Sequence, residues 1–166
     1  MVALVYAALD DPGGWTRFLQ AFVTAVNTTQ AVFSLTHSDH WEWSISAYVG
    51  LEEESIRQYA EAWAIHDPWV AHLNMGGAAR GLVVPSQELC PDDVLEELEI
   101  YRQFLKPLGF HYGGGVLLDS QPTLTAFMST SRPKSRGTLN SEELGLWQSL
   151  VPHMQRAIRL HGERAP

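Results

Sequence analysis

The chain has 166 residues, 45% of them hydrophobic and 18% charged, which suits one domain with a single sizeable core. Its net charge of −8 repels phosphate backbones and argues against direct binding of nucleic acid. With one cysteine, Cys90, neither an internal disulfide nor a cysteine metal cluster can form. The sequence shows no basic-then-apolar leader and no bilayer-length apolar run, so we expect a cytoplasmic protein that does not enter a membrane.

An amphipathic helix is predicted from Asp10-Asp11-Pro12, where an aspartate can cap the helix and proline fits its first turn. Apolar residues follow at helical spacing: Trp15, Phe18, Leu19, Phe22, Val23 and Val26. Residues 31–36 form a β-branched and aromatic run, and residues 41–49 alternate apolar with polar side chains. The two runs flank a polar tip and predict a β-hairpin with one apolar face.

A second helix is predicted from Leu51-Glu52-Glu53-Glu54, because acidic residues in a first turn are favoured by the helix dipole. Its apolar face consists of Ile56, Tyr59, Ala60, Trp63 and Ala64. Pro68 disfavours the helical conformation at Asp67, so we expect the helix to stop there. A short helical piece over residues 69–73 should follow.

The second half of the chain predicts a third amphipathic helix over residues 91–107, then a second hairpin from the runs 110–118 and 123–130. Asn140 and Glu143 have the spacing of a capping box at the start of a last helix. Apolar residues recur along that helix at steps of three and four: Leu144, Trp147, Val151, Met154 and Ile158. This seam can pack inside the domain or pair with another chain.

The order of these elements predicts an α+β fold: an antiparallel β-sheet with helices on both faces, as in PAS- and GAF-like α/β/α sandwiches. The terminal helices should share one face of the sheet, and the middle helices should cover the other. A ligand cavity can open between the sheet and the middle helices.

Three stretches, 59–69, 101–109 and 151–158, together resemble the N-terminal sensor region of LuxR-family transcriptional regulators. The resemblance extends over nearly the whole chain. It implies a single sensor domain over residues 1–160, with residues 161–166 beginning a linker to a helix-turn-helix domain that this chain lacks. It further implies that the regulator forms a homodimer and contacts DNA only through that absent domain.

In the acyl-homoserine-lactone receptors of this family, a tyrosine lines the acyl pocket and the aspartate of an Asp-Pro pair accepts a hydrogen bond from the ligand amide. By position these residues resemble Tyr59 and Asp67. The sequence departs from the receptors at two pocket tryptophans, where it has Ser55 and the run 84–86. The part of the pattern that contacts the lactone is therefore missing.

The candidate ligand-contacting residues are aromatic side chains and one acid: Trp43, Tyr59, Trp63, Asp67, Trp69, Tyr101 and Phe104. Each aromatic residue can equally belong to the core, and Asp67 can simply cap the next short helix. Our leading hypothesis is a small-molecule-sensing regulatory domain that binds a mostly apolar ligand. The alternative is a ligand-free module that dimerises through the seam of the last helix and transmits a signal.

No pattern in the sequence supports catalysis, a cofactor or a metal. The cluster His37-Ser38-Asp39-His40 lacks a third ligand nearby, and nothing around Cys90 activates its thiol. Gly113-Gly114-Gly115 leads into a strand and not into a helix, so it lacks the geometry of a phosphate-binding loop. Close packing or a bulge explains the glycines better.

Overall fold

The computed structural model describes residues 1–37, 45–74, 79–121 and 124–164. Its centre is a five-stranded sheet in the order β2-β1-β5-β4-β3, in which all neighbouring strands are antiparallel. The strands are β1 (Gln30–His37), β2 (Ile45–Val49), β3 (Val84–Pro85), β4 (Tyr112–Gln121) and β5 (Leu124–Arg132). The pairs β1–β2 and β4–β5 correspond to the two predicted hairpins, and the pairing of β1 with β5 joins them into one sheet. Residues 41–44, which the prediction assigns to the second strand of the first hairpin, lie outside the described residues.

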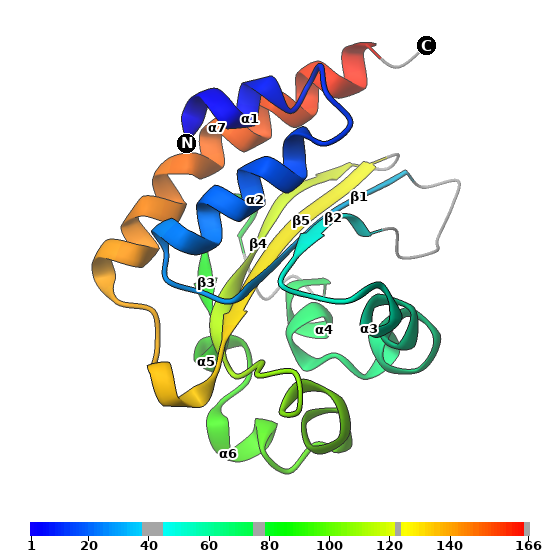
Figure 1. Ribbon diagram of the computed structural model, residues 1–166, viewed down its shortest axis with the longest axis vertical. Helices are drawn as coiled ribbons and strands as arrows, with labels where there is room; N and C mark the ends of the chain where they lie inside the picture. The colour runs from blue at the N-terminus through cyan, green and yellow to red at the C-terminus, as the bar shows by residue number, and fades with distance from the viewer. Residues whose placement is uncertain (38–44, 75–78, 122–123, 165–166) are drawn as a thin grey trace.

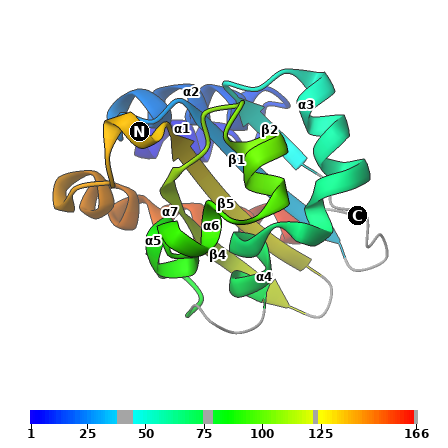
Figure 2. The same cartoon turned by 90° about the horizontal axis from the view of Figure 1, so that it is seen from below.

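Helices cover both faces of the sheet (Figure 1). One face carries α1 (Val2–Ala7), α2 (Gly14–Ala25) and α7 (Ser141–Arg164). The other carries α3 (Glu53–Gln58), α4 (Pro68–Asn74), α5 (Ser86–Leu89) and α6 (Asp92–Leu95), which stand in front of the strands in Figure 2. The predicted α+β architecture, with terminal helices on one face and middle helices on the other, is confirmed.

The larger hydrophobic core lies between the sheet and the terminal helices. It includes Phe18 and Phe22 from α2, Phe33 from β1 and Met128 from β5, all fully buried. The apolar seam of α7 lies in the same core, with Trp147, Val151, Met154 and Ile158 at most 1% exposed. The seam therefore packs inside the domain. On the opposite face, the middle helices bury two smaller clusters.

The start of the chain differs from the prediction. Residues 2–7 form a helix that the sequence did not indicate, and α1 packs on both α2 and α7. Asp11 does not cap a helix that begins at Pro12, because α2 begins at Gly14 and Gly13 is its N-cap. Asp11 instead accepts a hydrogen bond from the Gly13 backbone N–H and pairs with Arg17, closing the turn before the helix.

The predicted third helix is divided into two pieces. The short α6 ends at Leu95, and a π-helical segment, Tyr101–Leu105, follows after an irregular turn. Leu95 and Ile100 are both buried in one cluster, although five residues of a regular helix would place them about 140° apart. A break between them lets both side chains face the same core.

The second helix also changes its winding. After α3, the chain continues as a π-helical segment, Tyr59–Trp63, and then as a 3₁₀ turn, Ala64–His66. Asp67 is extended, with φ −72° and ψ 111°, and α4 begins at Pro68. The predicted stop before Pro68 and the short helix after it are both confirmed.

The capping box of α7 is confirmed. The backbone N–H of Glu143 donates to Asn140 Oδ1 at 2.8 Å, and that of Asn140 donates to Glu143 Oε2 at 2.9 Å. Arg132, only 3% exposed at the end of β5, donates to Glu143 Oε1 at 3.1 Å. It also binds the backbone carbonyls of Asn27, Gly137 and Thr138, which fixes the start of α7 against the sheet.

Candidate ligand-binding site

A cavity of about 80 Å³ lies between the sheet and the middle helices, where the sequence predicts one. Its floor comes from β1, β4 and β5, and its walls come from α3, α4, α5 and the segment around Phe104 and Phe110. Most of the lining is apolar. Because one water needs roughly 10–15 Å³ of such space, the cavity has room for a small organic group.

The floor of the cavity includes two glycines of β4. A Cβ on Gly115 would lie 3.0 Å from Leu73 Cδ1, on the side where α4 packs. A Cβ on Gly114 would lie 2.7 Å from the Val84 carbonyl oxygen and 3.1 Å from Cζ3 of Trp147 in α7. The glycine run therefore serves close packing on both faces of the strand, as predicted.

Asp67 is the one carboxylate among the described residues that line the cavity, and it is 7% exposed. Its Oδ1 accepts hydrogen bonds from the backbone N–H groups of Trp69 at 2.9 Å and Val70 at 3.1 Å. Its Oδ2 accepts a hydrogen bond from the Tyr59 hydroxyl at 2.9 Å. The cap interpretation is confirmed: the carboxylate satisfies two donors of the first turn of α4 and also holds Tyr59.

Burial raises the pKa of the Asp67 carboxyl above its ordinary range, and the three hydrogen bonds from Val70, Tyr59 and Trp69 oppose that rise. Burial and the neighbouring Asp67 carboxylate also raise the pKa of the Tyr59 hydroxyl. The phenol therefore remains a donor at physiological pH. Asp67 is thus a fixed hydrogen-bond acceptor and Tyr59 a fixed donor, and most of their hydrogen-bonding capacity is used within the protein.

Comparison with known proteins identifies solved structures that share this fold. No family model matches the sequence, and neither does any curated protein. The LBD domain of VqsR from Pseudomonas aeruginosa matches with a TM-score of 0.74 and 17% identity over 98% of this chain and 94% of that chain. SdiA from Escherichia coli matches with a TM-score of 0.65 and 17% identity, covering 93% of this chain and 63% of that one.

CepR2 from Burkholderia cenocepacia, an N-acylhomoserine lactone dependent transcription factor of the LuxR family, matches with a TM-score of 0.62 and 12% identity over 96% of this chain and 92% of that chain. This chain has the fold of a LuxR-type sensor domain. GAF domains are also among the matching structures, which agrees with the predicted sandwich. At these identities the likeness concerns the fold.

Within this LuxR-type fold, four of the predicted residues line the cavity: Tyr59, Asp67, Trp69 and Phe104. Trp63 and Tyr101 are not in the lining, contrary to expectation. Trp63 stacks on Phe104 with ring centroids 6.1 Å apart, so it supports the wall from outside. Trp43 lies outside the described residues, and its place in the site stays a prediction.

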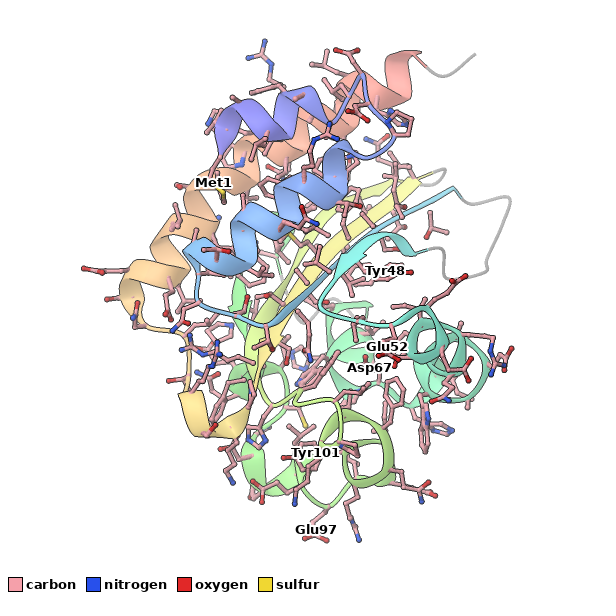
Figure 3. The ribbon with its side chains drawn as sticks, viewed as in Figure 1. Met1, Tyr48, Glu52, Asp67, Glu97 and Tyr101 are labelled. Carbon is pink, nitrogen blue, oxygen red and sulfur yellow. The ribbon has the colours of Figure 1, made fainter. Side chains whose placement is uncertain are left out.

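Tyr101 is 5% exposed and belongs to a polar network that the sequence did not reveal. Its hydroxyl lies 2.6 Å from Nδ1 of His111, whose Nε2 lies 3.3 Å from Asp92 Oδ1. The Tyr112 hydroxyl donates to the other oxygen of Asp92. In Figure 3, Asp67 and Tyr101 both lie on the side of the sheet that the middle helices cover, with Tyr101 below Asp67. The network ties the π-helical segment and α6 to β4, beside the cavity.

Several cavity residues were not singled out from the sequence. Gln30 from β1, Ser86 from α5 and Ser129 from β5 are polar residues that line the floor and one wall. Ser55 stands where the lactone receptors have one tryptophan, and Ser86 belongs to the run 84–86 where they have the other. Both serines line the cavity. The register of strand pairing and the position of the covering helices decide which strand residues face a cavity. The sequence shows neither of them.

Among the described residues, no three His, Cys, Asp or Glu side chains are grouped to hold a metal ion. Residues 38–40 of the histidine cluster lie outside the described part of the chain. Cys90 is 4% exposed, and burial raises the pKa of its thiol, as expected of an inert structural cysteine. None of the described helices is long and apolar enough to cross a membrane.

Proposed function

We propose that this chain is the small-molecule-sensing domain of a LuxR-type transcription factor and binds a mostly apolar ligand in the cavity between the sheet and the middle helices. The observation that carries the proposal is the cavity itself: a mostly apolar space with a few polar side chains, at the place where this fold can bind a ligand. The fold shared with CepR2, a lactone-dependent regulator, supports the same role.

The remainder of the regulator follows from this role. Residues 1–160 would form the sensor and residues 161–166 the beginning of a linker to a helix-turn-helix domain. DNA contact would come only through that domain, since a net charge of −8 disfavours binding by the sensor. The regulator would act in the cytoplasm as a homodimer, and the domain would sense its ligand without catalysing a reaction.

The ligand is expected to differ from a homoserine lactone. Ser55, which replaces a tryptophan of the lactone receptors, lines the cavity and offers only a hydroxyl. Asp67, the counterpart of the residue that receives the ligand amide, already accepts three hydrogen bonds within the domain. A ligand here would have to find its polar contacts on other side chains.

The alternative of a module that dimerises through the α7 seam loses its main support. The seam residues Trp147, Val151 and Met154 are fully buried against α2 and the sheet, so they are not available to a second chain. A dimer of the regulator would need other surfaces.

The proposal can be tested with N-phenyl-1-naphthylamine, an uncharged apolar dye that fluoresces when it enters a dry site. We expect saturable binding, and a rise in unfolding free energy of about 2.7 kcal/mol at a hundredfold excess over Kd. Ser129→Trp, on the floor of the cavity, should fill the cavity and abolish binding. Ser135→Trp, on an exposed turn, is the matched control and should bind normally. Absence of binding by the unaltered chain, or equal binding by Ser129→Trp, would contradict the proposal.

A further inference from the structure

Asp67 is a buried carboxylate without a positively charged partner among the described residues. It is 7% exposed and lines the cavity. Both of its oxygens accept hydrogen bonds, from the backbone N–H groups of Trp69 and Val70 and from the Tyr59 hydroxyl, and these bonds favour the ionised form. All three donors are uncharged, and no ion pair in the described part of the chain includes Asp67. Buried charges in proteins are normally paired with an opposite charge, and this one is not.

The neighbours of this carboxylate in the cavity lining are aromatic. Tyr59 contacts it through the 2.9 Å hydrogen bond, and the backbone N–H of Trp69 lies 2.9 Å from Asp67 Oδ1. Phe104 is close to both, because its ring centroid lies 6.1 Å from that of Tyr59. All four residues line the cavity. The face of an aromatic ring is electron-rich and attracts cations, so a carboxylate and three aromatic residues at one place together favour positive charge.

The remainder of the lining provides no opposing charge. Of the described residues that line the cavity, none is a lysine, arginine or histidine, and Asp67 is the one carboxylic acid. The hydroxyls of Ser55 and Ser129 form no hydrogen bond with the described residues. Each hydroxyl can donate or accept, so the two serines can pair with a polar group without selecting its charge. An anion in the cavity would lose its hydration and meet a second negative charge, whereas a cation would meet an opposite one.

We propose that the cavity selects an organic cation, an alkylammonium or arylalkylammonium whose positive nitrogen lies beside Tyr59, Trp69 and Phe104 and whose apolar part fills the remaining space. The ligand supplies the counter-charge that Asp67 lacks. Direct contact with the carboxylate is not required, because Coulomb attraction extends over several ångströms where water is excluded. The aromatic rings replace part of the hydration that the cation loses on entry. This inference rests on the proposed sensing function and assigns the charge of its ligand.

Three small aromatic probes separate charge from shape. Benzyltrimethylammonium is a permanent cation, neopentylbenzene is its uncharged isostere with carbon in place of nitrogen, and phenylacetate is an anion at neutral pH. Each is measured by displacement of N-phenyl-1-naphthylamine from the unaltered chain. We expect the cation to bind at least about tenfold more tightly than the anion, because the carboxylate attracts the first and repels the second. The uncharged isostere reports the fit of the shape alone.

Two variants assign the contributions. Asp67→Asn removes the charge and keeps an amide oxygen that can cap α4. It should weaken benzyltrimethylammonium by at least about tenfold, leave neopentylbenzene within about twofold, and tighten phenylacetate. Phe104→Leu removes one ring and should weaken the cation by about threefold or more relative to its isostere. Asp93→Asn removes the same charge from an exposed residue outside the lining, so it is the control and should change no probe.

The outcomes distinguish the two proposals. If the dye binds but phenylacetate displaces it as well as benzyltrimethylammonium does, the inference fails and the sensing function stands. The inference also fails if Asp67→Asn weakens the cation and its isostere by the same factor, since that loss would come from the shape of the cavity. Should Asp67→Asn not fold, the three probes on the unaltered chain and on Phe104→Leu decide the question. If the dye does not bind to the unaltered chain at all, the proposed function fails and this inference fails with it.

Discussion

Replacing Tyr59 with phenylalanine tests the central polar contact of the cavity. The substitution removes one hydroxyl, whose hydrogen bond to Asp67 Oδ2 is 2.9 Å long, and leaves the ring in place. The acceptor is a carboxylate that is 7% exposed, so water cannot easily replace the lost donor. Hydrogen bonds to charged groups contribute about 1.5–3 kcal/mol, and we expect Tyr59→Phe to lose that amount of unfolding free energy.

For a chain of this length, each kcal/mol corresponds to about 2–4 °C, so the midpoint of thermal unfolding should fall by about 3–12 °C. Urea titration at neutral pH gives the free energy directly, and a double-mutant cycle with Asp67→Asn isolates the pair. The loss should shrink when Tyr59→Phe is introduced into the Asp67→Asn variant, because the charged acceptor is gone. Tyr48→Phe is the control, since the Tyr48 hydroxyl forms no hydrogen bond with the described residues. A loss below about 0.5 kcal/mol, or one unchanged in the double mutant, would refute the reasoning.

Three further predictions concern stability. Arg132→Met leaves the largely buried Glu143 without its partner and should cost about 3–5 kcal/mol in urea unfolding; a loss near zero would mean the pair is not formed. Gly113→Ala should destabilise far more than Gly137→Ala, because a Cβ at Gly113 would lie 1.9 Å from a backbone carbonyl oxygen and one at Gly137 meets nothing within 4 Å. Gly137→Ala should lose only the strain of its positive φ, about 1–3 kcal/mol, and equal thermal shifts would contradict this. Burial raises the pKa of the Asp67 carboxyl above 3.8, so the folded chain binds the carboxyl proton more tightly than the unfolded chain does. The free energy of unfolding, relative to that of Asp67→Asn, should therefore fall as pH rises from 3.8 through the folded pKa. Urea titrations that give the same difference between the two proteins at every pH would contradict this prediction.

The elements with strong periodicity could be read from the sequence. Both hairpins, the body of α2, the acidic start of α3 and the capping box of α7 were predicted because each depends on neighbouring residues alone. The order of these elements then indicated the sandwich, and the pairing of β1 with β5 completes it. The stop before Pro68 was predicted for the same reason: the ring acts on the residue directly before it.

Elements that depend on tertiary packing were missed. The helix α1 has six residues, which is too short for a helical repeat to stand out, and its packing on α2 and α7 secures it. The division of the predicted third helix follows from the need to bury Leu95 and Ile100 together, which no local preference shows. The π-helical winding over residues 59–63 is likewise absent from the apolar pattern.

The candidate site could be predicted only in part, because it too depends on tertiary packing. An aromatic side chain at helical spacing faces inward whether it meets a cavity or another ring, so Phe104 and Tyr101 could not be told apart. The structure separates them because Tyr101 meets His111, ten residues away in sequence. Gln30 could not be identified from the sequence, because a polar residue at the start of a strand is common. Only the folded structure, in which helices cover the sheet, shows that its Oε1 is buried without a partner among the described residues.

The unequal cores on the two faces of the sheet have a consequence for how a molecule reaches the cavity. The terminal helices rest on a large continuous core, whereas the cavity side is built from short helices and π-helical or 3₁₀ turns over two small clusters. Segments with few buried contacts open locally at lower free energy than the rest of a domain. Amide hydrogens of α3 to α6 should therefore exchange faster than those of α2 and α7. Entry through transient opening of that layer would leave the sheet intact, and an occupant would slow exchange on that face first.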